Sequence, residues 1–276
     1  MKEAEPDKGN AKGLFSTVIP PTLTACAVLG LWYFFSLVVL NEGQRFLLPA
    51  PHQVVETAFF RWRNLEELLL AARATSLVTV LGLSLAIWIG MMIAISMSQA
   101  RWFERTFFPY AVAIQAVPII AIVPVIGLWM GFSFAARVLV TSMISIFPII
   151  TNTLFGLKSI ESNYHDLFTL HKASRSTRLL RLQLPGALPA IFTGFRISAG
   201  LGVVGAIVGE FFFRGGKERG IGRLLATYQA RLQIELLVAG IFFSSLLGVA
   251  LFVGFSALSN RVLASWRPPR PGQMNG

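Results

Sequence analysis

Few side chains in this sequence could do chemistry, and Glu210 is the first of them. It lies in the run GAIVGEF at residues 205–211, near the end of a long apolar stretch. A carboxylate inside a membrane is costly, so it usually marks a pathway for a solute or a proton. The alternative is that Glu210 lies shallow enough to reach water or to pair with Arg214, one turn further along. The sequence leaves both interpretations open.

Gln115 is the second candidate, because its amide can donate and accept hydrogen bonds beside helix-breaking prolines. Pro118 and Pro124 follow it in the same apolar stretch. Prolines that interrupt a membrane helix leave backbone carbonyls open to a cavity. We expect Gln115 to line a translocation pathway and Pro124 to act as a structural kink.

No pattern in the chain indicates an enzyme, a cofactor site or a metal site. The three histidines are scattered among loops without ligand spacing, and no nucleophile can be placed beside a base. Gly216-Lys217 lacks the upstream glycine of a phosphate-binding loop and is followed by Glu218. We expect no catalytic, cofactor-binding or metal-binding residue here. The formal net charge of +11 comes without a nucleic-acid motif, so no nucleic-acid partner is expected.

The elements that hold these residues are long apolar stretches. Of the 276 residues, 54% are hydrophobic and only 13% are charged, and the mean hydropathy is +0.65. A helix needs about 20 apolar residues to cross a hydrocarbon core of about 30 Å. The sequence therefore predicts an all-α membrane protein with a transmembrane domain at 16–260 and tails at 1–15 and 261–276. Six stretches meet the length requirement, at about 16–40, 72–98, 106–130, 134–156, 189–213 and 233–260.

Basic residues in the tails and loops predict the orientation. Thirteen Lys and Arg lie on the side that carries both tails, and eight lie on the opposite side. The excess predicts a multi-pass membrane protein with both termini in the cytoplasm, in contact with anionic lipid. Arg137, at the start of the fourth span, is expected to extend its side chain outward to the membrane surface.

Small residues recur along one face of the fifth span. Such stripes allow helix backbones to approach one another closely. The stripe either packs within one chain or forms a contact between two copies of the chain. Its members are Gly194, Ser198, Gly202, Ala206 and Gly209.

A basic segment at 158–188 separates the fourth and fifth spans. Cationic side chains recur at three- and four-residue spacing from His171 to Arg181, beside a stripe of leucines. This pattern predicts an amphipathic helix that begins near a cap at Asn163 and ends at Pro185. The helix is either interfacial, with its arginines among lipid headgroups, or a docking element for a cytoplasmic partner.

The basic segment resembles the cytoplasmic loop of permease subunits of ATP-binding-cassette (ABC) importers, written E-A-A-x3-G-x9-I-x-L-P. Counting back from Leu184-Pro185 places Leu182 at the isoleucine, Lys172 at the glycine and the triplet DLF at 166–168 at E-A-A. Lysine does not share the tolerance of glycine for positive φ, so we expect this turn to be built differently. The resemblance implies a coupling helix that docks on an ATPase. The residues it assigns to coupling are Asp166, Leu167, Phe168, Leu170, Lys172, Ala173, Ser174, Arg175, Leu184 and Pro185.

The resemblance extends over most of the chain. The runs GFRISAG at 194–200, VGEF at 208–211 and GIG at 220–222, with LPAP at 48–51, are similar to the branch that includes nitrate, sulfonate, taurine, riboflavin and thiamine-precursor permeases. It implies a six-span type I importer permease that works by alternating access. It also implies a homodimer with the fifth-span stripe at its interface and along the pathway. The implied partners are two cytoplasmic ATPase subunits, which bind ATP and Mg, and an extracytoplasmic solute-binding protein.

Within that branch, the substrate is expected to be riboflavin or a thiamine-pyrimidine precursor, because 166–168 and 205–210 look most like those permeases. Nitrate, sulfonate and taurine are the alternatives. A secondary transporter is a more remote alternative, which would show an internal repeat and several buried ionisable groups. The sequence shows no such repeat and only one good candidate acid.

Overall fold

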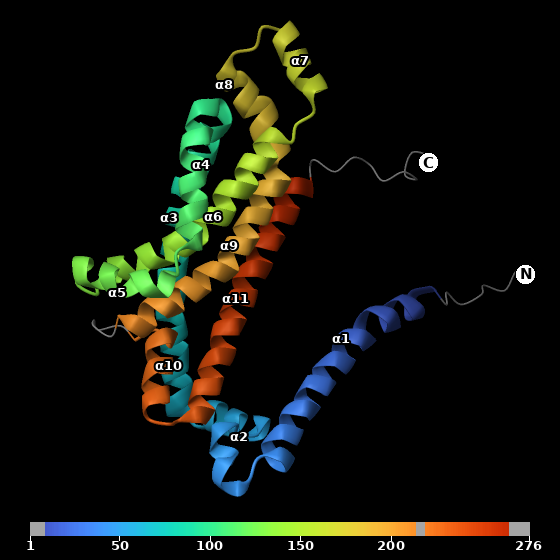
Figure 1. Ribbon diagram of the computed structural model, residues 1–276. Helices are drawn as coiled ribbons and strands as arrows, with labels where there is room; N and C mark the ends of the chain where they lie inside the picture. Colours follow the sequence, from blue (N-terminus) through green and yellow to red (C-terminus); the bar gives the residue numbers. More distant parts are fainter. Residues whose placement is uncertain (1–8, 214–218, 265–276) are drawn as a thin grey trace, which may run out of the picture. The chain divides into compact units, whose positions relative to one another are not determined.

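The computed structural model describes residues 9–213 and 219–264, and nearly all of these residues are helical (Figure 1). No strand occurs in these two ranges. The α-helices are α1 (Gly9–Phe34), α2 (Pro51–Val55), α3 (Trp62–Gln99), α4 (Arg101–Ala116), α5 (Ile119–Met130), α6 (Phe134–Lys158), α7 (Ser162–Leu170), α8 (Arg175–Arg178), α9 (Leu184–Phe212), α10 (Ile221–Ala230) and α11 (Ile234–Leu263). Short π- or 3₁₀-helical turns are η1 (Phe35–Val39), η2 (Glu42–Leu47), η3 (Glu56–Phe60) and η4 (Leu179–Gln183).

The chain divides into two compact units. One consists of the described residues of Met1–Leu65 and of Tyr228–Ala239, and the other of those of Glu66–Thr227 and Gly240–Gly276. The second unit holds the basic segment, the cavity-lining helices and the candidate acid, so it is the unit that matters for function.

In the first unit, side chains of the first span hold the LPAP run at 48–51. Trp32 Nε1 donates to the carbonyl of Pro49 at 3.0 Å, and Ser36 Oγ donates to the carbonyl of Leu48 at 2.8 Å. Prolines cannot donate a backbone hydrogen bond, so the carbonyls of such a turn need donors from elsewhere. The run therefore closes back on the end of the span that precedes it.

Five helical segments of the described chain are long and apolar enough to cross a membrane, and α4 with α5 makes a sixth when the pair counts as one broken span. The predicted span at 106–130 is broken at Pro118, where α4 and α5 meet at a bend of 97°. Val117 and Pro118 are both extended at the break, with ψ of 127° and 106°. Proline cannot donate to the preceding turn, and it disfavours helical backbone in the residue before it.

The core of the second unit lies along α6 and α9, which run side by side (Figure 1). Val140 and Phe213 are fully buried in a cluster near one end of this pair, and Leu157 with Ala187 is buried near the other. Burial of this kind fixes the relative positions of the basic segment and the far end of α9, because both are continuous with the packed pair.

Candidate functional site

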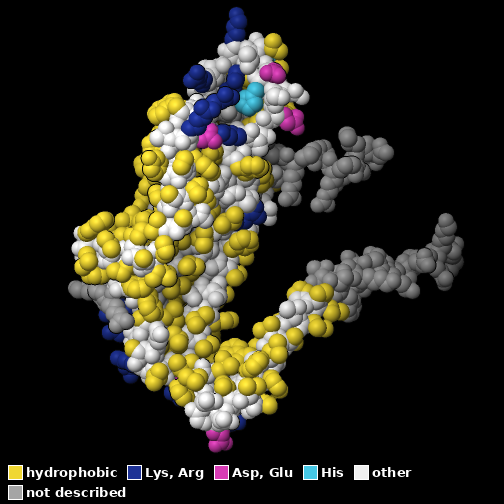
Figure 2. Space-filling model, viewed as in Figure 1, with side chains coloured by type: hydrophobic (Ala, Val, Ile, Leu, Met, Phe, Trp, Pro, Cys, Tyr) yellow, Lys and Arg dark blue, Asp and Glu magenta, His cyan; other side chains and the backbone are white. Residues whose placement is uncertain are grey.

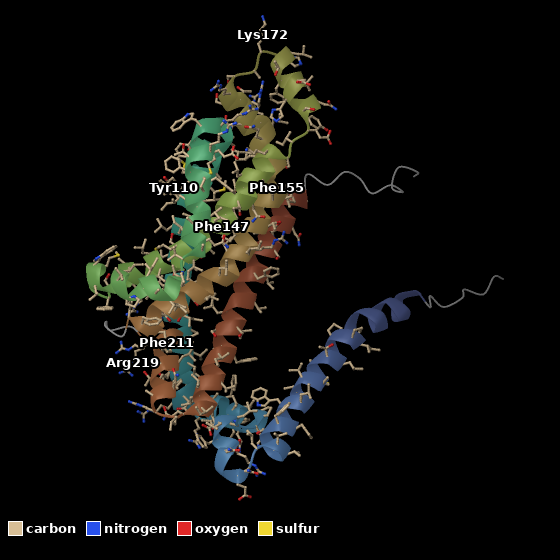
Figure 3. All side chains as sticks on the ribbon, in the orientation of Figure 1. Tyr110, Phe147, Phe155, Lys172, Phe211 and Arg219 are labelled. Carbon is tan, nitrogen blue, oxygen red and sulfur yellow. The ribbon has the colours of Figure 1, made fainter. Side chains whose placement is uncertain are left out.

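A tight turn separates α7 from α8 at the tip of the basic segment, and Lys172 occupies its left-handed position with φ of 49°. The amide of Ala173 donates to the carbonyl of Phe168 at 2.9 Å, and that of Lys172 to the carbonyl of Thr169 at 2.9 Å. This pair of bonds is the Schellman motif, which requires a left-handed residue after the helix. The expectation that lysine would change the turn was therefore wrong. Figure 3 shows Lys172 at the outer tip.

The basic segment is two helices rather than one. Ser174 Oγ accepts from the amide of Thr177 at 3.2 Å and so caps α8, while Arg178 Nη2 donates back to Thr169 Oγ1 at 2.9 Å. The predicted cap at Asn163 was wrong, since this residue lies inside α7, which begins at Ser162.

The helix that starts at α8 does not end at Pro185, contrary to the prediction. A π-helical turn, η4, leads directly into α9, where Leu184 and Pro185 form the first turn. Proline is tolerated there because its missing amide would have no partner in a first turn. Arg175–Phe212 therefore forms one membrane-span candidate of 38 residues. Leu184 packs with Leu157 and Ala187 instead of facing outward.

The face of α7 near the turn carries exposed apolar side chains. Leu170 is 80% exposed, and Tyr164 and Leu167 are about half exposed at the preceding positions of this face. Lys and Arg side chains gather around this end of the second unit (Figure 2). Exposed leucines among cations suit a protein partner with an apolar groove and acidic rim.

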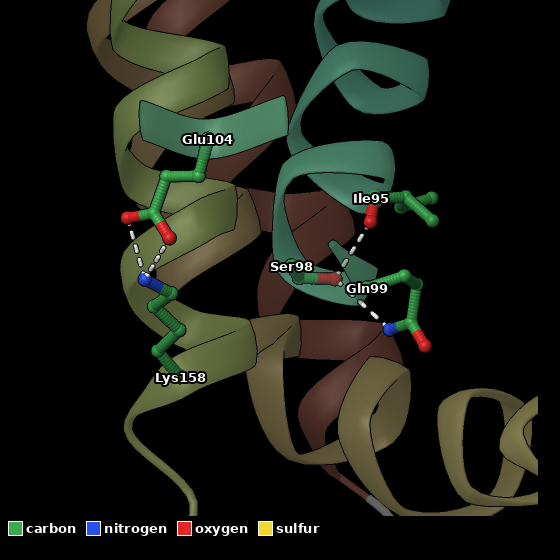
Figure 4. Close-up of polar contacts among 5 residues, drawn as sticks. All are labelled: Ile95, Ser98, Gln99, Glu104 and Lys158. Carbon is green, nitrogen blue, oxygen red and sulfur yellow. Dashed lines mark hydrogen bonds and ion pairs between the residues drawn. The ribbon is translucent and has the colours of Figure 1, made fainter. Parts of the chain in front are cut away.

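The helices that carry the basic segment are tied together where they leave the apolar region (Figure 4). Lys158, at the end of α6, forms an ion pair with Glu104 in the first turn of α4. Gln99, at the end of α3, donates to Gln183 Oε1 at 3.0 Å. These two contacts join α6 to α4, and α3 to η4, at this end of the second unit.

Gln115 lines a cavity of about 490 Å³ that opens beside the break between α4 and α5. Most of its lining is aliphatic, with Tyr110 and Phe107 from α4 and Phe147 from α6. Tyr110 and Phe147 are labelled in Figure 3. Among its lining residues none is Lys, Arg, His, Asp or Glu. A concave apolar site with one or two polar groups is the usual form of a small-molecule site.

Glu210 lies in the last turn of α9 and is only 1% exposed. Its Oε2 accepts from Thr75 Oγ1 at 2.8 Å and from the amide of Gly222 at 3.0 Å. Thr75 Oγ1 in turn accepts from the amide of Ile221 at 2.8 Å. Glu210 is not among the residues that line the cavity of Gln115, and it does not reach solvent within this chain. Its role in a pathway stays a prediction. Arg214, its suggested partner, lies outside the described residues.

Arg137 was predicted to extend to the membrane surface, but it is buried. It is 4% exposed, its Nη2 donates to the carbonyl of Phe213 at 3.5 Å, and its charge acts on the carboxylate of Glu210. A cation near a buried acid reduces the cost of burying both. This compensation explains why the side chain faces inward.

The stripe of small residues faces α6 of the same chain. A Cβ on Gly194 would lie 2.9 Å from the carbonyl oxygen of Pro148, and Ser198 Oγ donates to the carbonyl of Ser145 at 2.7 Å. Side chains of α6 pack against this face within one chain, and a contact between two copies of the chain stays a prediction. The residues concerned are Gly194, Ser198, Gly202, Ala206 and Gly209, all of them buried.

Sequence reasoning missed Thr75 and the aromatic side chains of the cavity. Thr75 looked like one hydroxyl among many in an apolar span, and nothing local indicates its partner 135 residues away. Tyr110 and Phe107 precede Gln115 by five and eight residues, and the proline break was the available signal that they share a cavity with it.

The family model described as "Binding-protein-dependent transport system inner membrane component" matches residues 86–264, more than half of the chain. The chain belongs to this family. It is therefore a permease subunit of an ABC importer, a helical multi-pass protein of the inner membrane, as the resemblance implied. Members of this family are transport subunits and not enzymes.

The permease is similar to three named relatives. It is 34% identical over 251 residues to the formylaminopyrimidine transport permease protein ThiX of Halalkalibacterium halodurans, covering 90% of this chain and 96% of that protein. It is 31% identical over 166 residues to the riboflavin transport system permease protein RibX of Chloroflexus aurantiacus, 60% of each chain. It is 27% identical over 250 residues to the putative aliphatic sulfonates transport permease protein SsuC of Escherichia coli, covering 91% and 92%.

Proposed function

We propose that this permease moves a small solute inward by alternating access, driven by two copies of a separate cytoplasmic ATPase that binds ATP and Mg. An extracytoplasmic solute-binding protein delivers the solute, and a second copy of the permease completes the pathway. Both termini lie in the cytoplasm. The observation that carries the proposal is the protruding α7–α8 pair, whose exposed leucines and capped turn form a rigid docking element.

The docking element can be tested by purification with its ATPase. We expect the ATPase encoded beside this permease to co-purify with the wild-type protein in mild detergent. Leu170→Glu places a charge on the apolar face, and Ala173→Glu and Arg175→Glu alter the turn and the start of α8, so each should lose the ATPase. Leu180→Glu is the matched control, because Leu180 is 63% exposed but lies on η4, beyond the docking face.

If the wild-type protein purifies without any ATPase, the proposal is contradicted. The secondary-transporter alternative is then favoured. An ATPase that stays bound to all of the variants would place the docking surface elsewhere on the cytoplasmic side.

For the substrate, we propose a planar uncharged ring compound, a thiamine-pyrimidine precursor or riboflavin, ahead of nitrate, sulfonate or taurine. The cavity supports this choice, since aromatic and aliphatic side chains line it and the amide of Gln115 supplies a donor and an acceptor. A small anion would need a cation or several donors to replace its water. The relative named for formylaminopyrimidine transport agrees with this choice.

Uptake into proteoliposomes that hold the permease, its ATPase and its binding protein tests the substrate. Labelled formylaminopyrimidine and riboflavin should compete for one pathway, and taurine should not. Gln115→Leu should lower uptake of the ring compound about ten-fold while leaving the ATPase bound, as expected for one lost hydrogen bond in a desolvated site. Taurine uptake by the wild-type protein would favour the sulfonate branch instead.

A further inference from the structure

A buried junction joins the end of α9 to the start of α10. It brings together two sequence runs, VGEF at 208–211 and GIG at 220–222. Glu210 supplies the acceptor, Thr75 of α3 bridges, and the first amides of α10 donate. A helix leaves its first amides without partners inside itself. In a water-poor setting these amides need protein acceptors, and Glu210 with Thr75 provides two of them.

The glycines of the second run are required by this contact. A Cβ on Gly220 would collide with the carboxyl group of Glu210, and one on Gly222 would collide with the carbonyl of Ile207. Only glycine at both positions allows the start of α10 to reach the end of α9. The negative side chain also lies where the dipole of α10 favours an anion.

A second polar contact between α3 and the start of α10 is weaker. Arg219 approaches Glu67 of α3 at 3.8 Å, and both side chains are substantially exposed (Figure 3). Water and salt screen such a pair, so it holds the helices loosely. The buried junction is therefore the stronger of these two polar contacts, and it adds to the apolar packing of Ile221 and Leu224 in α10.

The opposite end of α9 is continuous with the coupling segment. The 38 residues of Arg175–Phe212 run as one membrane-span candidate from α8 to the turn that holds Glu210, about 57 Å at about 1.5 Å per residue. Figure 1 shows α7 and α8 at one end of α9 and α10 at the other. Because α8, η4 and α9 are continuous, a displacement of α8 also moves Glu210, which accepts a hydrogen bond from α10.

We propose that Glu210 and Thr75 form a latch that makes α10 follow the movement of α9, so that events at the ATPase reach the extracytoplasmic face. Glu210 is a positioning residue in this scheme and does not touch the solute. The inference rests on the proposed function, because it takes α7–α8 as the docking element and α10 as extracytoplasmic.

Amide hydrogen exchange on the full-length permease tests the latch. Thr75→Val removes the bridging hydroxyl and keeps the side-chain shape, and exchange in peptides covering 219–227 should rise about five- to ten-fold. Thr79→Val is the matched control. Thr79 is equally buried one turn along α3, but its hydroxyl donates only to the carbonyl of Thr75 within the same helix. Equal exchange in the two valine variants would overturn the latch.

The transmission is tested on the complex with its ATPase, using ATP and vanadate as the probe. Trapping the ATPase with vanadate should change amide hydrogen exchange in the wild-type permease at 162–170 and at 219–227. In Thr75→Val the first change should persist and the second should be lost. A wild-type response at 219–227 in that variant would overturn the transmission. If no ATPase binds, the proposed function fails and the transmission with it, whereas the resting exchange still reports on the latch.

A second substitution guards against simple misfolding. Glu210→Gln keeps an oxygen acceptor for Gly222 and removes the charge, so resting exchange at 219–227 should rise less than in Glu210→Leu. Equal rises in the two variants would show that the hydrogen bonds do not hold α10, and the latch would be withdrawn.

Discussion

Lys172 adopts a backbone conformation that its residue type disfavours. Its φ of 49° lies in the left-handed region, where a side chain with a Cβ costs about 1 kcal/mol relative to glycine. The Schellman bonds from Ala173 and Lys172 to α7 compensate for that cost. The side chain itself projects outward, where its charge is available to a partner.

Lys172→Gly should stabilise the turn by about 1 kcal/mol relative to Lys172→Ala, because alanine carries the same left-handed strain and glycine does not. Both variants lack the charge, so the comparison isolates the backbone. Proteolysis at the turn in the solubilised protein measures the difference, with the glycine variant cut more slowly. Identical cleavage rates for the two variants would show that the strain is negligible.

At the scale of elements, the close approach of α6 and α9 is the main determinant of the second unit. Gly194 and Gly205 of α9 face α6 and leave no space for a Cβ, whereas Gly200 on another part of the same helix has nothing within 4 Å of its position. Gly205 therefore has no space for a side chain, whereas Gly200 on the same helix can accept one.

Gly205→Ala should lower the stability of the solubilised protein by about 1–3 kcal/mol, because the added methyl group meets the backbone of Thr141 at 2.9 Å. Gly200→Ala should leave stability unchanged or raise it by up to about 1 kcal/mol through helix propensity. Thermal unfolding midpoints in one detergent compare the two. Equal midpoints would mean that α6 and α9 can move apart at little cost.

The sequence predicted the existence and order of the spans, because apolar length is a local property. It predicted that prolines interrupt the third span but not the bend of 97°, because the effect of a proline depends on whether neighbouring helices support a straight rod or a bend. It failed for Arg137, which was assigned to the membrane surface, and it did not find the hydrogen-bond partner of Glu210. Their partners, Thr75 and Phe213, are distant in sequence, and only the fold brings them together.

At the scale of the whole molecule, the basic residues predict the orientation of the chain in the membrane, and the cysteine content allows a chemical test of that prediction. Cys26 is the one cysteine in the sequence, so Cys26→Ser gives a protein without thiols. In that background, Ser162→Cys should react with a membrane-impermeant maleimide only in inverted vesicles, and Arg231→Cys only in intact spheroplasts. Both positions are exposed. Labelling from the opposite sides would invert the proposed topology.

The length of α3 has a consequence for the lipid environment. Its 38 residues extend about 57 Å at about 1.5 Å per residue, nearly twice the roughly 30 Å of a hydrocarbon core. The charged residues near its start, between Arg63 and Arg73, belong in water or among headgroups. The excess length therefore emerges on one side only. Because α3 is hydrogen-bonded to Glu210 and to Gln183, a difference in bilayer thickness is met by tilt of the helix or by adjustment of the surrounding lipid rather than by sliding of α3.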